Sequence, residues 1–260
     1  MKIIRYQLDD EIGFGILEDD NSIRKLTESP FEKIIKSEIV TEIDKVKILP
    51  PVIPSKIIGV GLNYVSHIEE MGMKQPDFPM LFMKPPTAVI GSSDPIIYPT
   101  IGNIVEYEAE LAIVIGKPTR QIKESNALDH VLGYTCGNDV SERIIQKAEM
   151  SMGAILVSKG FDTFNPLGPV ISTDIDPKNT QIKARINGKE KQNANTSDLL
   201  FGVSKLISYI SEAILLLPGD VIMSGTPSGV GPIKAGDEIE IEIEGVGILQ
   251  NNVIDEESRF

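Results

Sequence analysis

The chain has 260 residues, and its 38 acidic against 25 basic side chains give a formal net charge of −13 at pH 7. Nucleic acids and anionic membrane surfaces repel so acidic a protein, so neither is an expected partner. The single cysteine, Cys136, excludes an internal disulfide, and the scarcity of histidine (His67 and His130) excludes a Cys/His structural zinc site.

The first fifty residues predict a small β-rich module. Strands are expected over residues 2–8 and 14–17, followed by a charged, weakly helical stretch over residues 28–39. This start is too charged for a signal peptide, and no apolar run in the chain approaches the roughly 18 residues that a membrane span needs. Together with the single thiol, these features predict a cytoplasmic protein.

Three prolines between Pro50 and Pro54 cannot donate strand hydrogen bonds, so they predict a boundary between residues 1–52 and residues 53–260. Strands outnumber helices in the larger part, and no regular βαβ alternation is visible. We therefore expect a mainly β (α+β) fold with a few helices. Strands are expected at residues 56–60, 80–83, 105–115, 221–223 and 238–244. Helices are expected at residues 63–71 with Asn63 as the N-cap, 125–131, 142–150 and 199–210.

Alternating glutamates begin the strand expected over residues 105–115. Glu106, Glu108 and Glu110 share one face of such a strand, with neighbouring backbone positions about 6.6 Å apart. Such a face is either exposed to solvent or holds a cation, because crowded carboxylates repel one another. The strand continues as an apolar run typical of a buried strand, which places these carboxylates at the edge of the core. The complete alternation over residues 238–244 instead indicates a solvated face.

Asp139 follows a strand and precedes a helix. It is either the N-cap of that helix or a third oxygen ligand beside the glutamates. Three carboxylates without a soft ligand suit Mg²⁺ or Mn²⁺.

His67 and Glu70 lie three residues apart on the helix expected over residues 63–71, which places them on one face. A carboxylate that orients an imidazole is the usual way to build a general base, although this spacing alone is a weak signal. Lys84 and Lys159 precede Pro85 and Gly160, and either lysine could be an ordinary surface residue.

A glycine-rich loop, residues 224–231, follows a strand near the C-terminus. It is not a phosphate-binding P-loop, because no Gly-Lys-Ser/Thr follows. Its backbone N–H groups and the Thr226 hydroxyl could hold a carboxylate.

Together, these segments resemble the fumarylacetoacetate hydrolase family, in the family's order and over about residues 55–255. The resemblance is carried by Gly61-Leu62-Asn63-Tyr64-Val65-Ser66-His67-Ile68-Glu69-Glu70-Met71, Met83-Lys84-Pro85, Tyr107-Glu108-Ala109-Glu110-Leu111, Gly137-Asn138-Asp139-Val140-Ser141, Lys159-Gly160-Phe161-Asp162, Pro166-Leu167-Gly168-Pro169 and Ser224-Gly225-Thr226-Pro227-Ser228-Gly229-Val230-Gly231. It implies a mixed β-sandwich roll, usually a homodimer, in which residues 53–260 form the catalytic domain.

The resemblance also implies a site, carried over motif by motif. The implied metal ligands for Mg²⁺ or Mn²⁺ are Glu108, Glu110 and Asp139, and the implied catalytic residues are His67, Glu70 and Lys159. Substrate contacts are implied for Lys84, Arg143, Gln146 and Thr226. Glu106 lies outside the motif and is expected to be structural. The chain departs from the family at Leu62, where many members have arginine, and on either side of Arg143, where Ala-Arg-Asp is common.

The implied activity is hydrolysis of a C–C bond in a 2,4-dioxo acid, of the acylpyruvate or fumarylpyruvate type, through a metal-bound enolate. In this hypothesis, Glu70 orients His67, which activates water, and Lys159 adds positive charge near the enolate oxygen. The same chemistry would also support isomerisation of a hydroxymuconate-like or 2-hydroxyhepta-2,4-diene-1,7-dioate-like acid, decarboxylation of an oxaloacetate-like acid or dehydration of a sugar acid. A noncatalytic protein that binds metal and a 2-oxo acid is the alternative from another class.

Overall fold

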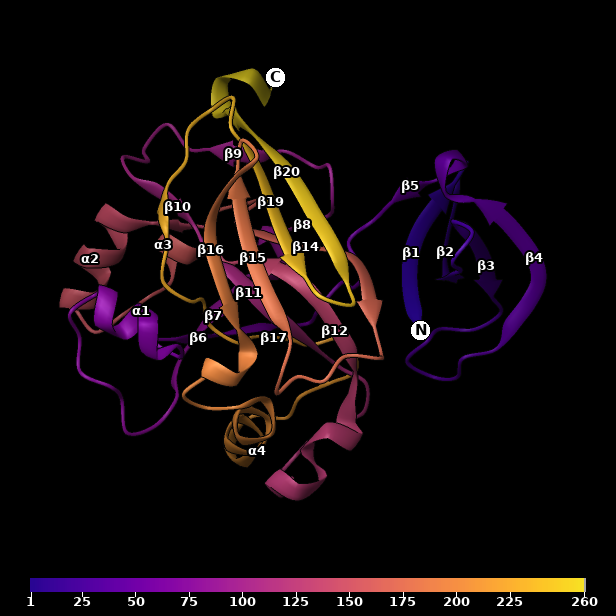
Figure 1. Cartoon of the computed structure of the whole chain (residues 1–260), viewed down its shortest axis with the longest axis horizontal. Helices are drawn as coiled ribbons and strands as arrows, with labels where there is room; N and C mark the ends of the chain where they lie inside the picture. The colour runs from indigo at the N-terminus through magenta and orange to yellow at the C-terminus, as the bar shows by residue number, and fades with distance from the viewer. Residues whose placement is uncertain (260) are drawn as a thin grey trace.

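The computed structural model describes residues 1–259, and strands make up most of its regular structure (Figure 1). Twelve strands form one large sheet, five form a second sheet and three form a third. The predicted mainly β fold with a few helices is therefore confirmed. None of the helices within residues 1–259 has the length and apolar character that crossing a bilayer requires.

The large sheet follows one hydrogen-bonded path of ten strands, with two short strands paired at its side. All neighbours on the path are antiparallel except β17 and β6, which are parallel. From one edge the path is β4 (Lys36–Glu42), β3 (Ser22–Leu26), β2 (Glu11–Leu17), β1 (Lys2–Leu8), β14 (Asn165–Ser172), β12 (Val131–Asn138), β11 (Ala109–Ile115), β17 (Val221–Met223), β6 (Ile57–Gly61) and β7 (Met80–Lys84). The side strands are β5 (Lys47–Ile48) on β1 and β8 (Val89–Ile90) on β14.

The five-stranded sheet covers the centre of the large sheet, as Figure 1 shows for β15, β19 and β20 in front of β11, β12 and β14. Its order is β16 (Lys189–Asn195), β15 (Gln181–Ile186), β19 (Glu238–Ile243), β20 (Gly247–Asp255) and β9 (Ile96–Tyr98). Leu111 and Ile113 of β11 share a buried cluster with Ile241 of β19, whereas Ala112 and Val114 belong to a second cluster. Both faces of β11 are therefore covered, which explains its unbroken apolar run.

The N-terminal residues form the antiparallel strands β1 to β4 and the short β5. Lys2 and Ile3 of β1 pair with β14, which carries the large sheet into this module. The weak helix predicted over residues 28–39 is wrong, because strand β4 begins at Lys36 and the residues before it form turns and bends. Pro30 disfavours a helix that runs through this stretch.

Four α-helices occur within residues 1–259: α1 (Val65–Glu70), α2 (Arg143–Ser151), α3 (Val157–Gly160) and α4 (Val203–Ala213). Asn63 is not the N-cap of α1. Its side chain instead donates to the carbonyl oxygens of Phe201 and Ser224 and thereby fastens the start of α1 to two distant segments. The helix predicted at residues 125–131 is a 3₁₀ helix, Glu124–His130. The other 3₁₀ segments are Ile43–Lys45, Pro86–Ala88, Thr196–Asp198 and Glu256–Arg259.

Candidate metal centre and active site

The strand predicted over residues 105–115 is interrupted at Glu108. It is divided into β10 (Val105–Tyr107), which lies in the three-stranded sheet between β13 (Ser141–Glu142) and β18 (Gly231–Pro232), and β11 in the large sheet. Glu108 N donates to Asn138 Oδ1 at 3.0 Å, and Asp139 N donates to the carbonyl oxygen of Glu108 at 2.9 Å. The expected uninterrupted strand is therefore wrong, because the chain changes sheets between Tyr107 and Ala109. Arg143 nevertheless contacts both Glu106 and Glu108, and Glu108 lies beside Glu110.

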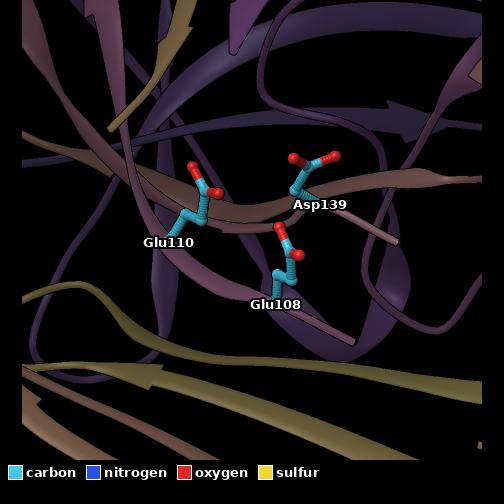
Figure 2. Close-up of side chains that lie close together, drawn as sticks. All are labelled: Glu108, Glu110 and Asp139. Carbon is cyan, nitrogen blue, oxygen red and sulfur yellow. The ribbon is translucent and has the colours of Figure 1, made fainter. Parts of the chain in front are cut away.

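Three carboxylates meet where β11 begins and β12 ends. Glu108, Glu110 and Asp139 are buried, with 5%, 1% and 1% of their surfaces exposed. One oxygen from each lies within 4.8 Å of the others, and Figure 2 shows the three carboxylates close together. Asp139 does not cap helix α2, since the N-cap is Glu142, which accepts a hydrogen bond from Ile145 N at 2.5 Å.

Two cationic side chains contact this triad. They line the same pocket as the three carboxylates. Lys159 Nζ lies 2.8 Å from Glu108 Oε2 and 2.7 Å from Asp139 Oδ2. Arg143 Nη2 lies 2.6 Å from Glu108 Oε1, and its Nε lies 2.6 Å from Glu106 Oε2. Glu106 thus pairs with Arg143 beside the triad, in line with its expected structural role.

The pKa values of Glu108 and Glu110 are shifted in opposite directions. Burial raises the pKa of Glu110 well above its ordinary value, and the nearby charges of Asp139 and Glu108 raise it further. Burial would also raise the pKa of Glu108, but the charges of Lys159 and Arg143 outweigh it and lower that pKa. Among the three carboxylates, Glu110 is the one without a direct Lys or Arg ion pair in the described part of the chain, although the charge of Lys159 partly offsets the rise in its pKa.

Lys84 lies behind Asp139 and does not line the pocket. Its ammonium group is fully buried and donates to Asp139, to the carbonyl oxygen of Phe164 at 2.8 Å and to that of Val140 at 3.3 Å. All three donors therefore have protein partners. This geometry disfavours the expected contact of Lys84 with substrate and points to a role in holding Asp139.

The predicted pairing of His67 and Glu70 forms on helix α1. His67 Nδ1 lies 3.1 Å from Glu70 Oε2, and the other oxygen of Glu70 accepts from Gly229 N at 2.9 Å. Because a carboxylate accepts hydrogen bonds, Nδ1 is the donor to Glu70, and in the neutral imidazole this leaves Nε2 as the nitrogen that can accept a proton. His67 is buried and lines the same pocket as the carboxylates.

A single pocket thus joins the histidine to the carboxylates. Gln146 accepts from Arg143 Nη1 at 2.8 Å, and Thr226 lies in the loop after β17, whose Gly225 N donates to Glu110 Oε2 at 2.8 Å. The pocket is lined by Val60, Gly61, Leu62, His67, Met71, Met73, Met80, Phe82, Glu108, Glu110, Asp139, Arg143, Gln146, Met150, Ile155, Lys159 and Thr226.

Gln192 is a supporting residue that the sequence did not reveal. It lies on β16 and is fully buried, although the strand around it is polar and largely exposed. Its Oε1 accepts from Ala109 N at 3.0 Å, and its Nε2 donates to Thr226 Oγ1 at 2.8 Å. Lys191 beside it has no partner in the register with β15, which marks a β-bulge of the kind that redirects a side chain. An isolated glutamine in a polar strand carries no sequence signal for this role.

Glu149 on α2 is the second supporting residue missed from the sequence. Its carboxylate accepts from Val157 N at 2.7 Å, from Ser158 N at 3.1 Å and from Ser158 Oγ at 2.5 Å. These contacts fix the first turn of α3, which carries Lys159. The only signal available was a glutamate on the face of a predicted helix.

The residues of the triad fit a divalent cation. Their donor set consists of carboxylate oxygens without thiolate or imidazole, which is the set that Mg²⁺ and Mn²⁺ prefer. A cation among them would relieve the repulsion that raises the pKa of Glu110. The buried triad could therefore hold a divalent metal.

Comparisons with known sequences identify families and relatives that this chain resembles. A family model described as "Fumarylacetoacetate (FAA) hydrolase C-terminal" matches residues 56–254, and one described as "Rv2993c-like, N-terminal" matches residues 1–51. Protein Rv2993c of Mycobacterium tuberculosis is 40% identical and covers 98% of both chains. The Xenopus laevis protein named oxaloacetate tautomerase fahd2, mitochondrial, is 43% identical over 80% of this chain and 69% of its own.

Solved structures extend the similarity to the whole described fold. The 5-carboxymethyl-2-hydroxymuconate delta-isomerase from Mycobacterium smegmatis superposes with a TM-score of 0.92 at 39% identity, covering 98% of this chain and 100% of that one. Maleylpyruvate hydrolase from Sphingobium sp. SYK-6 superposes with a TM-score of 0.80 at 29% identity and the same coverage. With the family model matching residues 56–254, the chain belongs to the fumarylacetoacetate hydrolase family of enzymes.

Proposed function

We propose that this protein is a divalent-metal-dependent hydrolase that cleaves the C3–C4 bond of a 2,4-dioxo acid of the acylpyruvate type. One observation carries the proposal: the buried triad of Glu108, Glu110 and Asp139 lines the same pocket as an imidazole oriented by a carboxylate. The triad suits binding of the 2-oxo acid end, and His67 suits proton transfer at the reacting carbons.

Glu108, Glu110 and Asp139 would hold the divalent ion, which would supply electrostatic stabilisation of negative charge at the 2-oxo acid end of the substrate. Lys159 holds a second positive charge at the same place, because its Nζ bridges Glu108 and Asp139. Burial would lower the pKa of Lys159, but Asp139 and Glu108 raise it, so the ammonium stays protonated. Lys159 thereby favours the enolate over the neutral ketone.

His67 would carry the proton transfers. Its Nε2 accepts a proton from a water molecule whose oxygen adds to C4 of the substrate. The C3–C4 bond then breaks, and its electron pair moves to C3 to give the enolate of pyruvate and a carboxylic acid. Nε2 returns its proton to C3, which yields pyruvate, and the carboxylic acid loses a proton to solvent. Glu70 holds the imidazole in the required tautomer throughout.

Keto–enol tautomerisation of a 2-oxo acid is a second candidate. The 43% identity with a protein named oxaloacetate tautomerase favours it. Tautomerisation needs proton exchange at C3 but no water addition at C4, so the same His67 could serve either reaction. The two candidates differ in whether a C–C bond breaks.

The test supplies acylpyruvates and the enol form of oxaloacetate with Mg²⁺ or Mn²⁺ and follows the products by NMR. We expect pyruvate and a carboxylic acid from the acylpyruvates, and loss of this reaction on chelation of the metal. His67→Ala should lower kcat by about 10²–10⁴-fold, the range for a general base. The matched control is His130→Ala, because His130 bonds to Thr119 at 3.0 Å and does not line the pocket.

Full cleavage activity in the His67→Ala variant or after metal removal would contradict the proposal. Accelerated ketonisation of oxaloacetate without acylpyruvate cleavage would establish the tautomerase instead. Tight binding of 2-oxo acids without any turnover would identify a noncatalytic binding protein.

A further inference from the structure

A second cavity adjoins the candidate active site, and the side chains that line it are apolar. Four of its residues, Met80, Phe82, Met150 and Ile155, also line the active-site pocket, so the two cavities meet there. The full lining is Met80, Leu81, Phe82, Met150, Gly153, Ala154 and Ile155. Within residues 1–259, none of the side chains that line this cavity carries a charge or a hydrogen-bonding group.

The cations of the active-site pocket are already bound to protein groups and do not line the second cavity. Arg143 is held by Glu106 and Glu108, and Lys159 is held by Glu108 and Asp139. A carboxylate placed in this cavity would therefore gain no cation, whereas an alkyl or aryl group would bury apolar surface against Phe82 and Ile155. We therefore expect the occupant of this cavity to be uncharged.

We propose that the apolar cavity receives the end of the substrate remote from its 2-oxo carboxylate, and that the enzyme prefers 2,4-dioxo acids with an alkyl or aryl group beyond C4 over 2-oxo diacids. The proposal rests on the proposed function, because that function places the 2-oxo carboxylate at the triad. Met80 and Met150 are two of the four residues that line both cavities, and the flexible methionine side chain adapts to groups of different shape. The cavity therefore suits a range of acyl groups.

The first experiment measures kcat/KM for acetylpyruvate, butanoylpyruvate, hexanoylpyruvate and benzoylpyruvate against fumarylpyruvate, with saturating Mg²⁺. Each methylene that enters the cavity should raise kcat/KM by up to roughly fourfold, the value expected for burial of one CH₂ group. Fumarylpyruvate should be the poorest of the series. Equal or better use of fumarylpyruvate than of hexanoylpyruvate would overturn the proposal.

A pair of variants tests the position of the apolar group. Met150→Arg places a cation in the shared wall and should lower kcat/KM for hexanoylpyruvate while raising it for fumarylpyruvate. Met152→Arg is the matched control, because Met152 lies two residues away, is 75% exposed and lines neither cavity. It should leave the substrate preference unchanged. The same change in preference in both variants would overturn the assignment of this cavity.

Calorimetry on the wild-type protein separates failure of this proposal from failure of the proposed function. The ligands are 2-oxohexanoate and 2-oxoadipate, which have the same number of carbons and differ at the remote end by a methyl or a carboxylate. We expect 2-oxohexanoate to bind at least about tenfold more tightly. Equal or tighter binding of 2-oxoadipate, with acylpyruvates still cleaved, would overturn this proposal alone. Absence of both 2-oxo acid binding and cleavage would overturn the proposed function and this proposal with it.

Discussion

Two segments with similarly spaced glutamates differ in whether the fold buries those glutamates or leaves them exposed to solvent. In residues 238–244, Glu240 and Glu242 lie half-exposed on β19 beside Arg185, while the intervening Ile241 is buried. In residues 106–110, the strand ends at Tyr107 and the two later carboxylates point into the protein. Spacing alone therefore does not determine whether a glutamate is solvated or buried.

The surroundings of each carboxylate make the difference. The Glu108 carboxylate is buried with Lys159 and Arg143 as ion-pair partners, and Glu110 receives a backbone hydrogen bond from Gly225. These partners come from other elements of the fold and offset part of the cost of burying a charge. The glutamates of β19 need no such partners because water solvates them.

The largest contrast is expected from neutralising one glutamate in each segment. Glu110→Gln removes a carboxylate of the triad and should lower kcat by about 10³-fold or more and weaken Mg²⁺ binding, because charge stabilisation at the reacting centre is lost. Glu240→Gln should leave both quantities within about twofold, as is usual for a surface substitution. Enzyme assays and calorimetry with Mg²⁺ check the pair. Similar losses in both variants would contradict the functional distinction.

The pH dependence of Mg²⁺ binding should also distinguish the buried Glu110 from the exposed glutamates of β19. The pKa of Glu110 is raised in the metal-free protein, so Mg²⁺ must displace a proton from this carboxyl. Below that raised pKa, Mg²⁺ affinity should therefore increase with pH, by up to roughly tenfold per pH unit for one proton. Calorimetry in buffers of different ionisation enthalpy measures the released proton. Glu110→Gln should flatten the dependence, and an unchanged slope would assign the proton to another group.

Glu149 represents a third situation, a buried glutamate that binds backbone N–H groups rather than a metal. Burial would raise its pKa, but hydrogen bonds from Ser158 and Val157 outweigh this effect and lower it. Its contribution to stability is therefore present above its unfolded-state pKa and is lost as the pH falls through its lowered folded-state pKa.

The corresponding variant, Glu149→Gln, should destabilise the protein by about 1 kcal/mol, as loss of a helix cap does, and should lower kcat by loosening Lys159. Thermal denaturation at several pH values and steady-state kinetics measure both effects. The control is Glu212→Gln on the exposed side of α4. If kcat does not change despite the lost stability, Glu149 does not position Lys159.

The smallest effect is expected for the solvent-exposed ion pairs of strand β19. Arg185→Ala removes contacts with Glu240 and Glu242 on β19 and should cost about 0.2–1 kcal/mol, because water and salt screen exposed ion pairs. Urea denaturation at low and high salt measures this loss, which should shrink as salt is added. A salt-independent loss would indicate that packing of the arginine stem is responsible.

Much of the fold could be predicted from periodicity and turn residues. The helix expected at residues 142–150 is α2, and the apolar stripe over residues 199–210 contains most of α4. The uninterrupted strand over residues 105–115 was wrong, because local patterning does not reveal that a strand changes sheets. The break at Glu108 depends on bonds to Asn138 and Asp139, which lie about thirty residues away.

The candidate site could be predicted only as far as its residues lie in local motifs. The triad and the pair of His67 and Glu70 are each visible as short segments, and the structure brings them to one pocket. Gln192 and Glu149 could not be found in this way, because each supports the site through tertiary contacts with other elements. Lys84 is the opposite case. It belongs to one of the local motifs, but its side chain does not line the pocket.

The bulge in β16 implies an unusual sensitivity to insertion and deletion. Lys191 is the extra residue of that bulge, and Gln192 next to it bonds both to Ala109, between Glu108 and Glu110, and to Thr226. Side chains alternate between the two faces of a strand, so a one-residue insertion or deletion between Gln192 and Asn195 would turn the Gln192 amide away from both partners. Such a change in this outer strand would therefore remove support from the site while leaving every acidic and basic group of the pocket in the sequence.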